Sequence, residues 1–368
     1  MRLGIVELYC GTSGKKGYYN SQEIGLAKAM KKLGHDITIF YPRLDLKKIV
    51  EETIDENIRV VYVPAKAIGV HSRYDWNVLK IYQIEVVQLG SDNQLFAPDV
   101  ITYCDKNKIL LYSFIGTTGS DSENALKKFV LRCLYKRNIN AYKTHMCFAK
   151  TPAVKQQLEM SGIKGTSLAP VGLDMDNIPQ TSENKMQLRQ KLGIPLDKQI
   201  ILFVGRLDTY KRPLEAIKLL DSMNDTTYLI MIGTGGLNDE ITDEIEKRGL
   251  KNLVLRMETI LNKEIHKYYQ ICDYYLNFNT NEIFGMSILE AMYHGCTVLA
   301  CHAPGPDFII QDKISGYLVD TVTEMQNIIK HNEKLNPEKI RSRVYEEFVW
   351  DRTAQIFDNW IRYKIKAK

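Results

Sequence analysis

Two stretches in the second half of the chain combine charged side chains with glycines. In the first, Arg206 and Lys211 follow Gly205 and come just before an expected helix. Two cations at the start of a helix suit a diphosphate group and require no metal ion. In the second, Glu282 precedes Gly285, whose N–H group would lie at the start of another helix, where anions bind readily. A solvated basic loop and an ordinary ion pair are the alternative interpretations.

Glu290 lies within the helix that we expect from Ser287 to Tyr293, on an otherwise apolar side. Burying a bare carboxylate is costly, so this side chain must be paired, hydrogen-bonded or facing a ligand. Ribose hydroxyls are natural donors to such an oxygen. Two further glycine-rich loops, Gly11–Gly17 and Gly233–Gly236, could approach an anion closely, but simple turns explain them almost as well.

Short β-branched runs alternate with helix-length segments along the whole chain. This alternation predicts βαβ units and parallel sheets, hence an α/β fold with two Rossmann-like domains. Ligands of such sheets bind beyond the carboxyl ends of the strands, where the loops described above would lie. The expected strands are Leu3–Leu8, Ile37–Tyr41, Arg59–Val63, Val100–Tyr103, Ile109–Tyr112 and Met146–Ala149, then Ile200–Val204, Tyr228–Ile232, Leu253–Arg256, Tyr274–Phe278 and Thr297–Ala300.

The composition, with 45% hydrophobic and 25% charged residues among 368, is that of a soluble globular protein with two domains. No apolar run approaches the roughly 18–20 residues that span a bilayer. The seven cysteines form no CxxC pair, which predicts reduced thiols and a cytoplasmic location rather than disulfides or a zinc site. A net charge of only +5, without interleaved aromatic and basic residues, argues against nucleic-acid binding.

Gly205-Arg206-Leu207 with Lys211, and Glu282-x7-Glu290, resemble the retaining GT-B glycosyltransferases of family four. The resemblance implies two Rossmann-like domains facing each other across a cleft. Residues 1–178 would form an N-terminal acceptor-binding domain and residues 179–345 a nucleotide-sugar-binding domain. A C-terminal helix, residues 346–368, would cross back to the first domain.

The resemblance also implies roles for individual residues. Arg206, Lys211 and Glu282 would be the catalytic residues: the two cations neutralise the departing diphosphate, and Glu282 orients the donor sugar. Glu290 would bind the ribose hydroxyls. No metal or cofactor is expected. The full donor-binding set would be Gly17, Gly205, Phe284, Gly285, Met286, Ser287 and Glu290, and the acceptor-side residues would be Tyr18, Tyr19 and Asn20.

The implied activity is that of a metal-independent retaining hexosyltransferase. It would move a sugar from a nucleotide-sugar donor, UDP-sugar before GDP-mannose, to a saccharide or lipid-linked acceptor in polysaccharide or glycan synthesis. One departure is Ile115, which occupies the place of a histidine that many members carry. A nucleotide-sugar 2-epimerase and a non-catalytic nucleotide-sugar-binding subunit are the alternatives.

Residues 125–158 contain eight basic residues and no acid, with an apolar stripe at helical spacing that includes Phe129 and Cys133. A basic amphipathic helix can lie on an anionic membrane surface, here the inner face of the plasma membrane. A core helix with a solvated basic face explains the same pattern.

Overall fold

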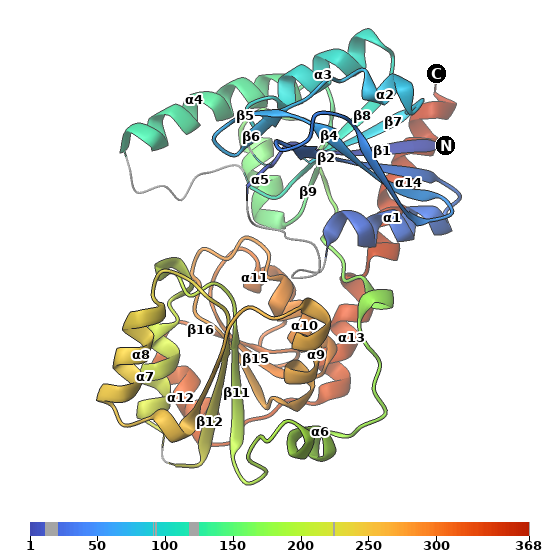
Figure 1. The fold of residues 1–368 in the computed structure, drawn as a ribbon. Coiled ribbons are helices and arrows are strands. Elements are labelled where there is room, and N and C mark those ends of the chain that lie inside the picture. The colour runs from blue at the N-terminus through green and yellow to red at the C-terminus, as the bar shows by residue number, and fades with distance from the viewer. Residues whose placement is uncertain (12–20, 91, 93, 118–124, 224, 368) are drawn as a thin grey trace. The chain divides into compact units, whose positions relative to one another are not determined.

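The structure, a computed structural model, describes residues 1–367 apart from 12–20, 91, 93, 118–124 and 224 (Figure 1). The chain forms two compact units. Unit 1 holds the described residues up to Gly172 together with those from Trp350 onward, and unit 2 is Leu173–Val349. None of the helices in these described residues is long and apolar enough to cross a membrane.

Unit 1 is built on one sheet, whose strand order is β10-β9-β8-β7-β1-β2-β4-β3. All neighbours are parallel except β3 and β4. The buried β-branched residues of its central strands form the core of the unit. The strands are β1 (Arg2–Glu7), β2 (Asp36–Arg43), β3 (Val50–Asp55), β4 (Ile58–Pro64), β7 (Val86–Gly90), β8 (Leu110–Ile115), β9 (Met146–Ala149) and β10 (Ser167–Leu168), beside the small hairpin β5 (Lys66–Ile68) and β6 (His71–Arg73).

One expected strand of unit 1 is wrong: Val100–Tyr103 belongs to helix α3 (Ala97–Lys106). The buried side chains of α3 are Ala97, Val100, Ile101 and Cys104, which recur at helical spacing and cover one face of the sheet. The other helices are α1 (Gln22–Lys32), α2 (Val78–Ile81), α4 (Ala125–Tyr142) and α5 (Pro152–Met160).

The C-terminal helix α14 (Trp350–Lys366), red in Figure 1, packs on unit 1, as expected. It lies against α1, and just beyond the end of α1 His35 Nε2 is 2.8 Å from Asp358 Oδ1. Burial lowers the pKa of His35 although Asp358 opposes this shift. Phe357 is fully buried, with its ring against those of Tyr112 and Phe148. Residues distant in sequence therefore complete the core of unit 1.

Unit 2 is built on a parallel sheet with the strand order β13-β12-β11-β14-β15-β16. The chain runs outward from β11 to β13 and then returns to the other side of β11, so the order reverses between β11 and β14. The strands are β11 (Gln199–Val204), β12 (Thr227–Ile232), β13 (Val254–Met257), β14 (Tyr274–Asn277), β15 (Thr297–Cys301) and β16 (Tyr317–Val319). The five strands expected for this half are confirmed, and β16 was not expected.

Helices cover both faces of this sheet (Figure 1). Those that matter for the site are α7 (Leu214–Asp221), α9 (Asn262–Ile271) and α10 (Met286–Tyr293). The others are η1 (Met175–Asn177), α6 (Lys185–Lys191), η2 (Thr209–Lys211), α8 (Asn238–Lys247), η3 (Lys251–Leu253), α11 (Pro306–Ile309), α12 (Val322–Lys330) and α13 (Pro337–Glu347).

The expectation that all cysteines are reduced is wrong for two of them. Cys272 and Cys296 form a disulfide, although they are 24 residues apart in sequence. The parallel pairing of β14 with β15 explains this, because Tyr274 lies opposite Thr297 and the cysteines just before these strands are therefore neighbours.

Candidate functional site

The loops after β11 and β14 lie at the same edge of the unit 2 sheet, where the strand order reverses. In open α/β sheets this reversal is the place where ligands bind. Lys211 comes from the first loop and Glu282 from the second, and Lys211 Nζ lies 2.5 Å from Glu282 Oε2. Their side chains are 21% and 13% exposed. The structure therefore brings these two expected residues together.

Glu282 Oε2 also accepts hydrogen bonds from Asn277 Nδ2 (3.3 Å) and Asn279 Nδ2 (3.2 Å). Both asparagines are buried, and their side-chain oxygens accept hydrogen bonds from the backbone N–H groups two residues further on. The loop after β14 is thus folded around its own side chains, which fixes the carboxylate of Glu282. A carboxylate oxygen held by an ammonium and two amides is well placed for orienting a polar ligand.

Arg206 is more exposed than Lys211 and has a different partner. Its guanidinium lies 2.6 Å from Asp208 Oδ2, and its side chain is 60% exposed. Asp208 Oδ1 in turn accepts a hydrogen bond from the N–H group of Gly236 (2.8 Å). The glycine loop after β12 therefore packs on the loop after β11. Gly235 has no room for a side chain, since a Cβ would overlap the carbonyl group of Leu207.

Helix α10 begins directly after Gly285, whose φ of 104° favours glycine. The preceding Phe284 is 7% exposed and packs edge to face on Phe348. Gly305 packs against the turn that precedes α10. Its N–H group donates to the carbonyl oxygen of Glu282 (2.8 Å), and a Cβ on it would overlap the backbone of Phe284. These contacts fix the start of α10 beside the Lys211–Glu282 pair.

The first turn of α10 contains Met286 and Ser287, both half-buried. Ser287 Oγ accepts a hydrogen bond from Tyr275 OH (2.7 Å), which links α10 to β14 beneath it. Gly205, at the end of β11, faces open space where a side chain would otherwise extend. The chain therefore leaves room at this edge of the sheet.

Glu290 lies one turn further along α10 and is 5% exposed. Its Oε1 accepts a hydrogen bond from Asn262 Nδ2 (2.8 Å) and its Oε2 from Tyr269 OH (3.0 Å), both on α9. Burial raises the pKa of Glu290 to about 7, and the two hydrogen bonds oppose this shift. Each carboxylate oxygen can accept a second hydrogen bond, so Glu290 keeps capacity for ligand hydroxyls.

Four expected residues, Gly17, Tyr18, Tyr19 and Asn20, lie outside the described residues. Ile115, at the end of β8 in unit 1, is 1% exposed and is part of the apolar core.

The sequence interpretation missed five residues that hold the expected ones in place. They are polar partners on neighbouring elements: Asp208, Asn262, Tyr269, Asn277 and Asn279. One signal was available for Asn277 and Asn279, because they lie at the end of an expected strand shortly before Glu282.

Residues 184–347 match the family model described as Glycosyl transferases group 1. Among curated proteins, the D-inositol 3-phosphate glycosyltransferase of Xylanimonas cellulosilytica is 27% identical over 42% of this chain and 39% of its own length. The alpha-monoglucosyldiacylglycerol synthase of Streptococcus pneumoniae is 24% identical over 40% of this chain and 35% of its own length. The chain thus spans less than half the length of these two relatives.

Solved structures resemble the whole chain at low identity. Sucrose-phosphate synthase from Thermosynechococcus elongatus superposes with a TM-score of 0.80 at 16% identity, with 100% of both chains covered. Anabaena HepE in complex with UDP-glucose superposes with a TM-score of 0.74 at 18% identity, with 99% of this chain and 100% of that chain covered. The chain thus has the GT-B fold, and the larger part of its second half, residues 184–347, resembles the glycosyl transferases group 1 family.

Proposed function

We propose that the protein is a retaining glycosyltransferase that transfers a hexose from a nucleoside diphosphate donor to a saccharide or lipid-linked acceptor. The observation that carries this proposal is the Lys211–Glu282 pair beside the start of α10. A cation and helix N–H groups suit a diphosphate, and a fixed carboxylate next to them suits sugar hydroxyls. UDP is the proposed donor nucleotide, supported by the UDP-glucose complex of HepE.

In this proposal, Lys211 and Arg206 stabilise the negative charge that develops on the departing diphosphate. Preorganised charges of this kind commonly make the largest contribution to catalysis. Glu290 holds the ribose, and Phe284, Gly205 and the first turn of α10 enclose the donor. All these residues belong to unit 2, so donor binding is assigned to residues 179–345 and acceptor binding to the N-terminal residues 1–178.

Retention of configuration can arise from attack on the same face of the sugar or from two successive displacements. A double displacement would need a carboxylate nucleophile, and Glu282 is the candidate from its position. However, Glu282 Oε2 already accepts three hydrogen bonds, which lowers its nucleophilicity. We therefore assign Glu282 to orienting the sugar and favour same-face attack, with a donor phosphate oxygen accepting the acceptor's proton.

Donor binding is tested by thermal unfolding of the full chain with UDP, GDP and their sugars. A ligand at 100 times its Kd adds about 2.7 kcal/mol of stability, which is easily measured. We expect stabilisation by UDP in the wild type and its loss in Lys211→Ala. Lys218→Ala, which removes an exposed lysine from α7, is the matched control. Equal stabilisation of the wild type and Lys211→Ala would contradict the proposed site.

Chemistry is tested by incubating the protein with UDP-glucose and following the products by NMR. A glycosyltransferase releases UDP, slowly with water and faster with an acceptor, and forms an α-linked product from the α-linked donor. A 2-epimerase would instead yield a donor sugar with inverted C2. The other alternative is a non-catalytic nucleotide-sugar-binding subunit, in keeping with Ile115 in the place of the histidine that many members carry. Such a subunit would bind UDP-glucose and leave it intact.

The acceptor partner is proposed to be a saccharide or a lipid at a membrane surface. The matched S. pneumoniae relative is named for a glycolipid product, and helix α4 presents exposed basic side chains, Arg132 and Lys136, with Phe129 64% exposed. Among the basic residues of 125–158 whose side chains the structure describes, Arg137, Lys150 and Lys155 pair with acids elsewhere, so the proposal rests on Arg132 and Lys136 of α4. Binding to vesicles with anionic lipid, but not to neutral ones, would support a location at the inner face of the plasma membrane. Equal binding to both would exclude it.

A further inference from the structure

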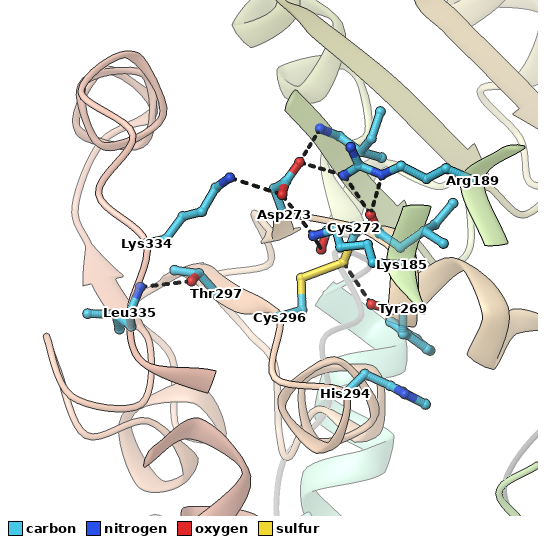
Figure 2. Close-up of a disulfide and its surroundings, with 12 residues drawn as sticks. Lys185, Arg189, Tyr269, Cys272, Asp273, His294, Cys296, Thr297, Lys334 and Leu335 are labelled. Carbon is cyan, nitrogen blue, oxygen red and sulfur yellow. Dashed lines mark hydrogen bonds and ion pairs between the residues drawn. A yellow bond between two sulfur atoms is a disulfide. The ribbon is translucent and has the colours of Figure 1, made fainter. Parts of the chain in front are cut away.

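The disulfide Cys272–Cys296 joins the carboxyl ends of two helices of unit 2 (Figure 2). Cys272 is the C-terminal cap of α9, and Cys296 follows the end of α10 by three residues. Both cysteines are 3% exposed. Among the cysteines in the described part of the chain, the other five are free.

The two bridged helices are the ones that hold Glu290. Asn262 and Tyr269 of α9 both donate to the carboxylate of Glu290 on α10. A second link runs between His266 and His294, whose facing ring nitrogens are 3.0 Å apart. The distance between α9 and α10 therefore determines how the Glu290 carboxylate is held, and the disulfide lies at one end of this helix pair.

Cationic side chains gather beside Cys272, as Figure 2 shows. Lys185 Nζ donates to the backbone oxygen of Cys272 (2.7 Å) and to Asp273 (2.8 Å). Arg189 and Lys334 bind the same Asp273 carboxylate at 2.7 and 3.1 Å. Three cations thus face one carboxylate next to the cysteine. An excess of positive charge stabilises a thiolate, which is the nucleophile of thiol–disulfide exchange.

We propose that Cys272 and Cys296 are a reversible thiol–disulfide modification site that controls how firmly α9 and α10 hold Glu290. Its coupling to nucleotide rests on the proposed function, because it assumes that Glu290 contacts the donor. In the disulfide form the helix ends are covalently joined. In the dithiol form the noncovalent links from α9 to Glu290 and His294 act without the covalent bond, so the two helices separate more often.

The reaction is exchange with a small disulfide such as glutathione disulfide. The Cys272 thiolate attacks one sulfur of glutathione disulfide and displaces one glutathione thiolate, which takes up a proton. The Cys296 thiolate then attacks Cys272 in the mixed disulfide and displaces the second glutathione. The two protein thiols lose two protons and two electrons, and glutathione disulfide gains them as two glutathione thiols. A dithiol such as dithiothreitol reverses the reaction.

The experiment compares the full chain after equilibration with glutathione disulfide or with dithiothreitol. Amide hydrogen exchange is followed in residues 262–272 and 286–296, and UDP binding is measured by calorimetry. In the wild type we expect faster exchange in both segments after reduction, and UDP binding weaker by about fivefold or more, at the lower end of typical coupling between sites. Cys296→Ser and Cys296→Ala should behave like the reduced form under both conditions. Cys301→Ser removes a buried thiol outside the bridge and should respond as the wild type does.

The outcomes separate this inference from the proposed function. Identical exchange in the two states, or alkylation showing both thiols free in glutathione disulfide, overturns the modification site. Equal UDP affinity in the two states overturns its control of Glu290. If the segments respond but UDP binds in neither state, the thiol–disulfide site is supported and the proposed nucleotide function fails.

Discussion

Replacing Glu290 with glutamine should stabilise the protein while weakening nucleotide binding. In the folded protein this carboxyl group keeps its proton up to a pH of about 7, because burial raises its pKa from 4.5. Between these two pH values the folded chain binds more protons than the unfolded chain, so the free energy of unfolding falls as the pH rises. At pH 8 the ionised Glu290 therefore costs about 3 kcal/mol, from about 2.5 pKa units at 1.36 kcal/mol each.

Glutamine fits the same surroundings without the charge. Asn262 Oδ1 is buried without a hydrogen-bond partner, so a modest amide rotation lets it accept from the new side chain. For a unit of this size, 3 kcal/mol corresponds to roughly 6–12 °C in Tm, which is an upper limit because the hydrogen bonds must rearrange.

Differential scanning calorimetry of Glu290→Gln and the wild type between pH 4 and 8 measures this effect. We expect the largest gain at pH 8 and almost none at pH 4, with Glu246→Gln, an exposed position on α8, unchanged throughout. At pH 8, where Glu290 is ionised, UDP affinity should fall by about 10–100-fold, as expected for losing a hydrogen bond to a charged group. A Glu290→Gln variant that unfolds at a lower temperature than the wild type at pH 8 would refute the reasoning.

Two further predictions concern the site and the core. Arg206→Ala and Lys211→Ala should each lower kcat by about 10²–10³-fold without changing the unfolding temperature much, because each removes one preorganised positive charge. Steady-state sugar transfer measures this, Lys218→Ala is the control, and wild-type turnover in both variants would contradict the assignment. Phe357→Ala should destabilise unit 1 by about 3–5 kcal/mol, since its ring is fully buried among other rings. Urea denaturation compares it with Tyr363→Ala, an exposed position on the same helix, and equal midpoints would disprove this packing argument.

Much of the fold could be predicted from β-branched runs, because strands buried on both faces are continuously apolar. The failures have local causes. Val100–Tyr103 has the composition of a strand, yet its buried positions continue a helical pattern that begins at Ala97. Strand β7 (Val86–Gly90) contains Gln88, a poor strand signal, which becomes acceptable when buried because it accepts a hydrogen bond from Tyr112 OH (3.0 Å) on the next strand. That partner is known only once the strand order is known.

The candidate site could likewise be predicted only in part. Glu282 and Lys211 could be proposed from residue type and from their position after strands. Their partners could not, because Asn277, Asn279 and Asp208 acquire a role only through the geometry of the folded loops. The disulfide was missed for a related reason: spacing in sequence says little when two parallel neighbouring strands bring distant residues together.

Helix α14 has a consequence for how the chain is made. The ribosome releases the N-terminal segments of unit 1 long before Phe357 and Asp358, the residues that cover Tyr112 and His35, have been synthesised. Unit 2 emerges complete in between. During synthesis the larger part of unit 1 therefore waits with an uncovered apolar face, and the unit finishes folding only after its last helix has left the exit tunnel.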